Sequence, residues 1–201
     1  FASGREILFP DITYSFYDVW ADLFRIPYET RPLDDDFRIV PGDYFRENGG
    51  IIFPNPNAPT GELLAIDQIE EIVRRNRDVV VIVDEAYIDF AGDDKSAIPL
   101  TEKYDNLLVV QTFSKSRSMA GMRIGFAIGS EKMIRYLNDC KYSFNSYTMN
   151  LPAILAGCAA MKDRPYFTEC VRRIVKTRER VKPALASLGF RFCDSQSNFL
   201  F

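Results

Sequence analysis

The chain has 201 residues and 47% of them are hydrophobic, which is enough to build a sizeable core and excludes an intrinsically disordered protein. Its formal net charge of −3 at pH 7 gives no general attraction for nucleic acid or for an anionic membrane, so neither is predicted as a partner. The sequence has four widely spaced cysteines and no histidine, which excludes zinc fingers, histidine-based triads and the usual transition-metal sites. Cysteines of this kind are typical of reduced thiols and predict a cytoplasmic location.

Apolar runs and turn residues alternate along the chain in a way that predicts its secondary structure. Strands are predicted at residues 6–9, 51–53, 79–83, 107–110 and 124–129, and residues 26–32 are predicted to be extended but broken by prolines. Helices are predicted at residues 15–24, 66–76, 101–104, 131–138, 148–161 and 165–188, and two last strands at 190–193 and 198–201. Strands that alternate with helices predict an α/β fold of three layers, in which a mostly parallel sheet lies between helices on both faces.

Three stretches give finer expectations. Residues 79–83 are a continuous β-branched run, which is typical of a strand buried on both faces. Thr13 can cap the helix that follows it. Residues 172–182 carry charges of both signs without interleaved aromatic residues, so we interpret them as the solvated face of a helix.

Candidate functional residues lie where predicted strands end. Asp84 follows one strand and Lys115 the next, and a right-handed crossover would bring both to one edge of the sheet. A lysine just beyond a buried strand is unusual because a buried ammonium is costly, and the same setting can lower a lysine pKa and produce a nucleophilic amine. The hydroxyls of Thr112 and Ser114, together with Arg123, could bind an anion such as phosphate.

Each of these residues also has a plainer interpretation. Taken alone, Lys115 is most often a solvated loop lysine, and Asp84 could cap a turn or a helix after its strand. Packing, capping and surface ion pairing are the alternatives for the other candidates, which are Tyr14, Tyr87, Thr112, Ser114 and Arg123.

Four motifs follow one another along the chain. They are FPNPNAPTG at 53–61, DEAY at 84–87, TFSK at 112–115 and GMRIG at 121–125. In this order and spacing they resemble the fold type I aminotransferases, which use pyridoxal 5'-phosphate, and within that superfamily most of all the histidinol-phosphate aminotransferase family. The resemblance covers nearly the whole chain. It implies a role in histidine biosynthesis, in which histidinol phosphate and 2-oxoglutarate are interconverted with imidazole acetol phosphate and glutamate.

The resemblance implies three catalytic residues. Lys115 would form the Schiff base with the cofactor aldehyde and, once freed, would act as general base and acid at the substrate carbon. Asp84 would hold the proton on the pyridine nitrogen of the cofactor. Tyr87 would donate a hydrogen bond to the phenolic oxygen of the ring.

Further cofactor contacts follow from the same resemblance. Arg123, Thr112 and Ser114 would bind the cofactor phosphate, and Tyr14 would stack on the face of the ring. One position departs from the family pattern, because Ala58 stands where the family usually has asparagine before Pro-Thr-Gly. Either the preceding Asn57 takes over the contact with the phenolic oxygen, or that bond is absent or supplied by water. We include Asn57 in the predicted site.

The resemblance also suggests how the chain is divided. Residues 1–175 are expected to form the large cofactor-binding domain without its N-terminal part, and residues 176–201 the start of the small C-terminal domain. The chain begins abruptly at Phe1 and ends within a predicted strand at Phe201, so we expect a piece of a longer protein. Alone, it is expected to bind the cofactor weakly at most and to have no useful turnover. The parent is expected to be a homodimer acting on small amino-acid and 2-oxo-acid substrates.

Several other functions are compatible with these residues. An aromatic amino-acid aminotransferase and a decarboxylase of a phosphorylated amino acid share the fold and the motifs. A transcription regulator with an aminotransferase-like sensor domain is an alternative of another class, and it would need a DNA-binding module upstream. A cofactor-free structural relative would not need Lys115 or Asp84.

Overall fold

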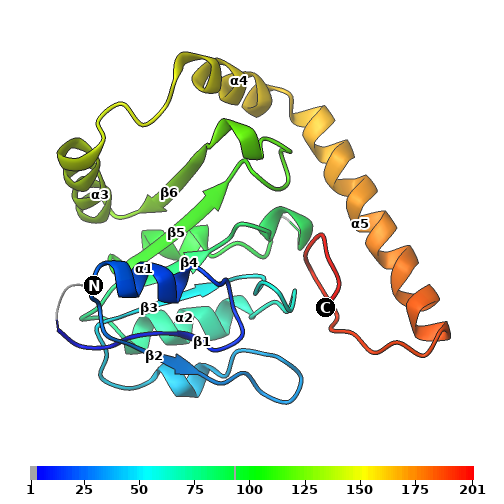
Figure 1. The fold of residues 1–201 in the computed structure, drawn as a ribbon, viewed down its shortest axis with the longest axis horizontal. Coiled ribbons are helices and arrows are strands. Elements are labelled where there is room, and N and C mark those ends of the chain that lie inside the picture. The colour runs from blue at the N-terminus through cyan, green and yellow to red at the C-terminus, as the bar shows by residue number, and fades with distance from the viewer. Residues whose placement is uncertain (1–3, 93) are drawn as a thin grey trace.

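The computed structural model describes residues 4–92 and 94–201, which form an α/β fold around a six-stranded sheet (Figure 1). The strands are β1 (Ile7–Pro10), β2 (Tyr28–Arg31), β3 (Gly50–Pro54), β4 (Val81–Asp84), β5 (Leu107–Thr112) and β6 (Gly125–Gly129). Their order in the sheet is β2-β1-β3-β4-β5-β6. All neighbouring pairs are parallel except β5 and β6, which are antiparallel. The predicted α/β fold with a mostly parallel sheet is therefore confirmed.

Helices connect and flank the strands. They are α1 (Tyr17–Leu23), α2 (Ile66–Arg75), α3 (Glu131–Phe144), α4 (Leu151–Lys162) and α5 (Arg164–Ser187). Side chains cap the last three, since Ser130, Asn150 and Asp163 each accept a hydrogen bond from a backbone N–H in the first turn. Helix α5 runs along one side of the molecule and crosses the expected domain boundary at residue 175 without a break (Figure 1).

The two faces of the sheet have separate cores. On one face, alternate residues of β1 pack against α1 in a cluster of Ile7, Phe9, Tyr17 and Ala21. On the other face, a larger cluster surrounds α2 and includes Leu8, Ile51, Phe53, Ile69, Ile72, Val73, Val81, Val83, Leu107 and Val109. Residues 69, 72 and 73 have the spacing of one apolar helix face, which explains why this segment is a helix that packs on the sheet.

The strand at 79–83 differs from its expected burial on both faces. In β4, Val81 and Val83 are fully buried, but Ile82 is only partly buried. The face of Ile82 borders an apolar groove of about 650 Å³ between α1 and α3. Among the side chains that line this groove are Trp20, Ile52, Ile82, Val110 and Leu137. A run of β-branched residues therefore overestimates burial here, because only one face of the strand is fully covered by the described residues.

Two other expectations are wrong. Residues 190–193 and 198–201 form no strands, since no described strand lies beside them; they meet through one bond from the N–H of Cys193 to the carbonyl of Phe201 (3.0 Å). Thr13 does not cap α1, whose N-cap is Phe16 without a side-chain bond. The Thr13 hydroxyl instead donates to Oδ1 of Asn57 at 3.1 Å.

Two observations concern the charged helix and the membrane. Arg172 forms an exposed ion pair with Glu169, as expected for a solvated face. Lys182, however, is half-buried where it pairs with Glu179 and Asp194, and Arg178 is 8% exposed and donates to the carbonyl oxygens of Phe90 and Ser197. Among the described helices, none combines the length and the apolar character needed to cross a bilayer.

Candidate active site

The candidate site lies at the carboxyl ends of β3, β4 and β5. The register pairs Pro54 with Asp84 and Asp84 with Val110, so these three strands end at one edge of the sheet. Parallel strands with helical connections place loop residues at this edge, which is where ligands bind in such folds. Residues 188–201, drawn in red, return from the end of α5 toward the same region (Figure 1).

Asp84 is the last residue of β4 and is held by two hydrogen bonds. Its Oδ2 accepts from the hydroxyl of Tyr17 at 3.0 Å, and its Oδ1 accepts from the backbone N–H of Ala86 at 3.1 Å. Burial raises the pKa of Asp84 above its usual value, while both hydrogen bonds and the charge of Lys115 act in the opposite direction. Burial, and then the adjacent Asp84 charge, raise the pKa of Tyr17. The two groups are thus arranged with tyrosine as donor and carboxylate as acceptor.

Lys115 lies three residues beyond β5, in a tight turn. The N–H of Ser118 donates to the Lys115 carbonyl at 3.1 Å, and the N–H of Met119 donates to the Phe113 carbonyl at 3.0 Å. This turn leaves Lys115 exposed, so the cost of burying an ammonium group does not arise in this arrangement. The amine is instead accessible to a ligand that enters from this edge of the sheet.

Tyr87 connects Lys115 with the C-terminal segment. The Nζ atom of Lys115 lies 5.0 Å from the centroid of the Tyr87 ring, which is within cation–π range. The other contact of this ring is with Phe199, edge to face, at 5.0 Å and 84°. Lys115 and Tyr87 are therefore in contact at this edge of the sheet, and the charge of Lys115 acts on Asp84.

The C-terminal segment also contacts the proline-rich loop at 54–61. The N–H of Gln196 donates to the carbonyl of Gly61 at 2.8 Å. Gly61 has a φ of +78°, and a Cβ at this position would lie 2.2 Å from Oγ of Ser195. Only glycine fits both this backbone conformation and this close approach. The Pro-Thr-Gly sequence thus fixes where residues 195–199 pass the site.

Thr112, Ser114 and Arg123 lie at the end of the β5–β6 pair. The Ser114 N–H donates to Oγ1 of Thr112 at 3.1 Å, and the two hydroxyl oxygens are 2.9 Å apart. Thr112 pairs with Gly125, so Arg123 lies near the same end of the sheet. Arg123 is exposed, has a φ of +55°, and donates from Nη1 to the carbonyl of Ala120 at 2.9 Å. Its position is therefore set by a left-handed backbone turn that is uncommon for a non-glycine residue.

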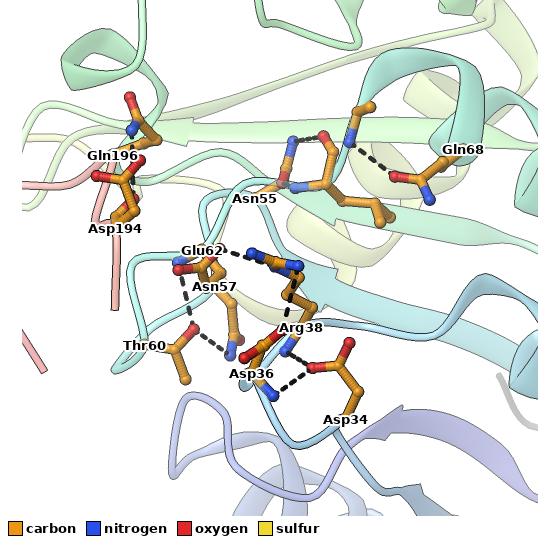
Figure 2. A network of polar contacts seen from close by, with 12 residues as sticks. Asp34, Asp36, Arg38, Asn55, Asn57, Thr60, Glu62, Gln68, Asp194 and Gln196 are labelled. Carbon is orange, nitrogen blue, oxygen red and sulfur yellow. Dashed lines mark hydrogen bonds and ion pairs between the residues drawn. The ribbon is translucent and has the colours of Figure 1, made fainter. Parts of the chain in front are cut away.

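Asn57 is committed to the loop in which it lies. Its Nδ2 donates to the carbonyl of Ile12 at 2.9 Å and to Oγ1 of Thr60 at 3.2 Å, a contact that Figure 2 shows. Its Oδ1 accepts from Thr13, and the side chain is 1% exposed. In this arrangement Asn57 joins the 54–61 loop to residues 12–13 and has no free amide hydrogen for a cofactor. Its cofactor contact stays a prediction, and it requires one of these bonds to be exchanged.

Tyr14 belongs to an aromatic group at the start of α1. Its ring is 43% exposed and lies 5.6 Å from the Tyr17 ring in an edge-on arrangement. Because Tyr17 bonds to Asp84, Tyr14 is placed near the carboxylate through its neighbour. The Tyr14 ring also stacks on Phe16 at 5.9 Å, so its stacking on a cofactor ring stays a prediction.

Two polar residues of this region were not predicted from the sequence. Tyr17 has the pattern of a core aromatic on the apolar face of α1, and nothing in its spacing marks its hydroxyl. Glu85 is 1% exposed and accepts hydrogen bonds from Ser96 Oγ (2.7 Å), the Ala97 N–H (2.5 Å) and Gln111 Nε2 (2.8 Å). Glu85 thereby connects residues 96–97 and β5 to the end of β4. In the sequence, this role is indicated only by its position directly after Asp84.

Lys115, Tyr87 and Asp84 thus lie at the edge of a mostly parallel sheet. The chain is a member of the aminotransferase class I and II family, whose model matches residues 1–201.

More specific similarity is to histidinol-phosphate aminotransferases. The chain is 56% identical over 201 residues to the one from Brachyspira hyodysenteriae, covering 100% of this chain and 56% of that one. It therefore spans about half the length of the curated relatives that it matches. It superimposes on the histidinol-phosphate aminotransferase of Clostridium acetobutylicum with a TM-score of 0.91 and 26% identity, over 98% of this chain and 60% of that one. The enzyme from Sinorhizobium meliloti in complex with pyridoxal-5'-phosphate shares the fold, with a TM-score of 0.88 and 22% identity over 98% of this chain and 54% of that one.

Proposed function

We propose that the full-length protein is a pyridoxal-phosphate-dependent aminotransferase that interconverts histidinol phosphate and 2-oxoglutarate with imidazole acetol phosphate and glutamate. The observation that carries the proposal is the 56% identity with a histidinol-phosphate aminotransferase across the whole chain, because this range includes every motif of the candidate site. Membership of the aminotransferase class I and II family supports the reaction class independently of the substrate.

The side chains of the site fit this cofactor chemically. An aldehyde needs a primary amine, and Lys115 offers an exposed one over the Tyr87 ring. A protonated pyridine nitrogen needs a carboxylate, and Asp84 accepts two hydrogen bonds from donors among the described residues, at 3.0 and 3.1 Å. A phosphate needs hydroxyl and guanidinium donors, and the side chains of Thr112, Ser114 and Arg123 carry such groups at the end of the β5–β6 pair.

We assign the residues the following roles. Bound pyridoxal phosphate supplies a ring that accepts the electron pair released at the substrate carbon. Lys115 holds the cofactor aldehyde and then carries the proton to and from the substrate carbon as general base and acid. Asp84 keeps a proton on the ring nitrogen, because a negative charge at this position favours the protonated form. Tyr87 orients the phenolic oxygen of the ring, and its contact with Phe199 restricts its own movement.

The remaining roles concern orientation. The hydroxyls of Thr112 and Ser114 and the guanidinium of Arg123 bind the phosphate and so set the angle at which the ring enters the site. Tyr14 covers one face of the ring. Asn57 contacts the phenolic oxygen only if one of its bonds to Ile12 or Thr60 is exchanged. These roles are the ones that the resemblance implies, and the polar side chains of the site support them.

We further propose that the parent protein is a cytoplasmic homodimer with its domain division near residue 175. Phe144 at the end of α3 and Tyr147 in the connection to α4 are each 93% exposed, which supports a protein interface there. The four cysteines are free thiols, which fits a reducing compartment. Light scattering of the purified full-length protein is expected to give twice the mass of one chain, and a monomer mass would contradict the dimer.

Substrate kinetics test the proposed reaction. The full-length protein with pyridoxal phosphate is expected to convert histidinol phosphate in the presence of 2-oxoglutarate, with glutamate as the second product. Its kcat/KM for histidinol phosphate is expected to exceed that for phenylalanine or tyrosine by at least about 10²-fold, because bound phosphate can form several charge-assisted hydrogen bonds. A preference for the aromatic amino acids would contradict the substrate, and release of carbon dioxide would indicate a decarboxylase.

A further inference from the structure

Tyr17 is a buried residue whose hydroxyl is aimed at the candidate site. It is the first residue of α1 and is 2% exposed. Its ring is surrounded by other aromatic rings, with centroid distances of 5.9 Å to Phe9, 5.6 Å to Tyr14 and 6.1 Å to Trp20. Side chains packed on several sides leave the ring little freedom to turn, so the direction of its hydroxyl is fixed by the core of this face.

The hydroxyl of Tyr17 reaches the Asp84 carboxylate across the edge of the sheet. Its oxygen lies 3.0 Å from Oδ2, and the residues are 67 positions apart in the sequence. The second carboxylate oxygen is held by the Ala86 N–H at 3.1 Å. A charge-assisted hydrogen bond to each oxygen defines both the plane and the rotamer of the carboxylate. The charge of Lys115 lowers the pKa of Asp84, and the Tyr14 ring contacts the Tyr17 ring edge-on at 5.6 Å.

We propose that Tyr17 is a positioning residue for Asp84: its hydroxyl holds Oδ2 so that the carboxylate stays ionised and directed at the cofactor ring nitrogen. The inference rests on the proposed function, because that function assigns the ring nitrogen to Asp84. Tyr17 itself does not touch the cofactor. It acts by stabilising the charged form of a partly buried acid, which a hydrogen bond to the charged form favours.

A conservative variant separates this role from packing. Tyr17→Phe keeps the ring and removes only the hydroxyl, so the aromatic group around Phe9, Tyr14 and Trp20 should stay intact. Tyr44→Phe is the matched control, because Tyr44 is 1% exposed and its hydroxyl has no hydrogen-bond partner among the described residues. Both variants delete a buried phenolic oxygen, and only one of them deletes a contact with Asp84.

Cofactor affinity is the first measurement, made by absorbance titration of the full-length protein with pyridoxal phosphate. Tyr17→Phe is expected to weaken the Kd about tenfold, the size of one hydrogen bond to a charged group, while Tyr44→Phe leaves it unchanged. In an Asp84→Asn background, Tyr17→Phe is expected to cause no further weakening, because the charge that the hydroxyl stabilises is gone. An unchanged Kd in Tyr17→Phe, or the same tenfold loss with and without Asp84, would overturn the proposal.

Unfolding of the protein without cofactor gives a second measurement that does not depend on the proposed function. Losing the Tyr17 hydroxyl raises the Asp84 pKa further in the folded state, so folding is weakened only where Asp84 is ionised. The urea midpoint of Tyr17→Phe is expected to fall below that of the wild type at about pH 7, and the difference should shrink toward about pH 4. A difference that is independent of pH would contradict a role through Asp84. A protein that shows this pH dependence but binds no cofactor would retain the contact and refute the proposed function.

Discussion

Replacing Lys115 with alanine is expected to lower the transamination rate of the full-length protein by at least about 10⁴-fold. Positioned general acid–base catalysis alone contributes roughly 10²–10⁴-fold, and the same amine also holds the cofactor. The rate would be measured as glutamate formation from histidinol phosphate and 2-oxoglutarate. Free amines added to the solution should restore little, because the fixed position of the Lys115 amine is what gives its reaction an intramolecular advantage.

The structure provides a matched control for this variant. Lys103 is also exposed, and its Nζ atom lies 3.5 Å from Oε1 of Glu70. Glu70 belongs to α2, which lies outside the site. Lys103→Ala removes the same side chain and should retain nearly the full rate. Because Lys115 is exposed, its removal should leave the thermal midpoint close to that of the wild type. A Lys115→Ala protein that keeps more than about a hundredth of the wild-type rate would be incompatible with its assigned role.

Asp84→Asn is expected to lower the rate by about 10²–10³-fold, the range observed when one preorganised electrostatic contact is removed from an active site. Asparagine keeps the shape of the side chain and an oxygen that can accept from the Ala86 N–H. It removes the negative charge that holds the proton on the ring nitrogen. The measurement is kcat at saturating cofactor, so that weaker binding does not account for the loss.

The stability of this variant should change in the other direction from its activity. Burial raises the pKa of Asp84 in the folded protein, so the folded state binds a proton more readily than the unfolded state. The ionised carboxylate therefore weakens folding at neutral pH, and this penalty disappears as the pH falls below the usual value for aspartate. Without cofactor, Asp84→Asn should be at least as stable as the wild type at pH 7.

An exposed aspartate supplies the comparison for this pair of results. Asp35 lies in the turn after β2 and is exposed, so Asp35→Asn should change neither the rate nor the unfolding midpoint appreciably. A marked loss of stability in Asp84→Asn, together with the loss of rate, would indicate a structural role for the carboxylate. A normal rate would remove Asp84 from the chemistry.

The elements with strong periodicity were predictable from the sequence. The apolar positions of α2 and the long charged stretch of α5, which ends before Gly189, placed both helices within a residue of their observed ends. The final segment was not predictable, because residues 190–201 have the composition of strands but no described strand to pair with. Pairing is a property of the surrounding fold, and local composition cannot supply it.

The candidate site was predictable only in part, for physical reasons that differ between residues. The position of Asp84 and Lys115 beyond neighbouring parallel strands follows from chain order and the handedness of crossovers. The exposure of Lys115 depends on a turn whose geometry is not encoded in the apolar pattern. The Tyr17–Asp84 contact joins residues 67 positions apart, and a buried tyrosine looks the same in a sequence whether or not its hydroxyl has a partner.

The absorption spectrum of the full-length protein after addition of pyridoxal phosphate shows whether Lys115 holds the cofactor. Wild type, Lys115→Ala and Lys103→Ala would be compared at equal protein and cofactor concentrations. We expect a protein-dependent visible band in the wild type and in Lys103→Ala that is absent from Lys115→Ala. The same band in all three proteins, or in none of them, would contradict the assignment of Lys115 as the residue that holds the cofactor.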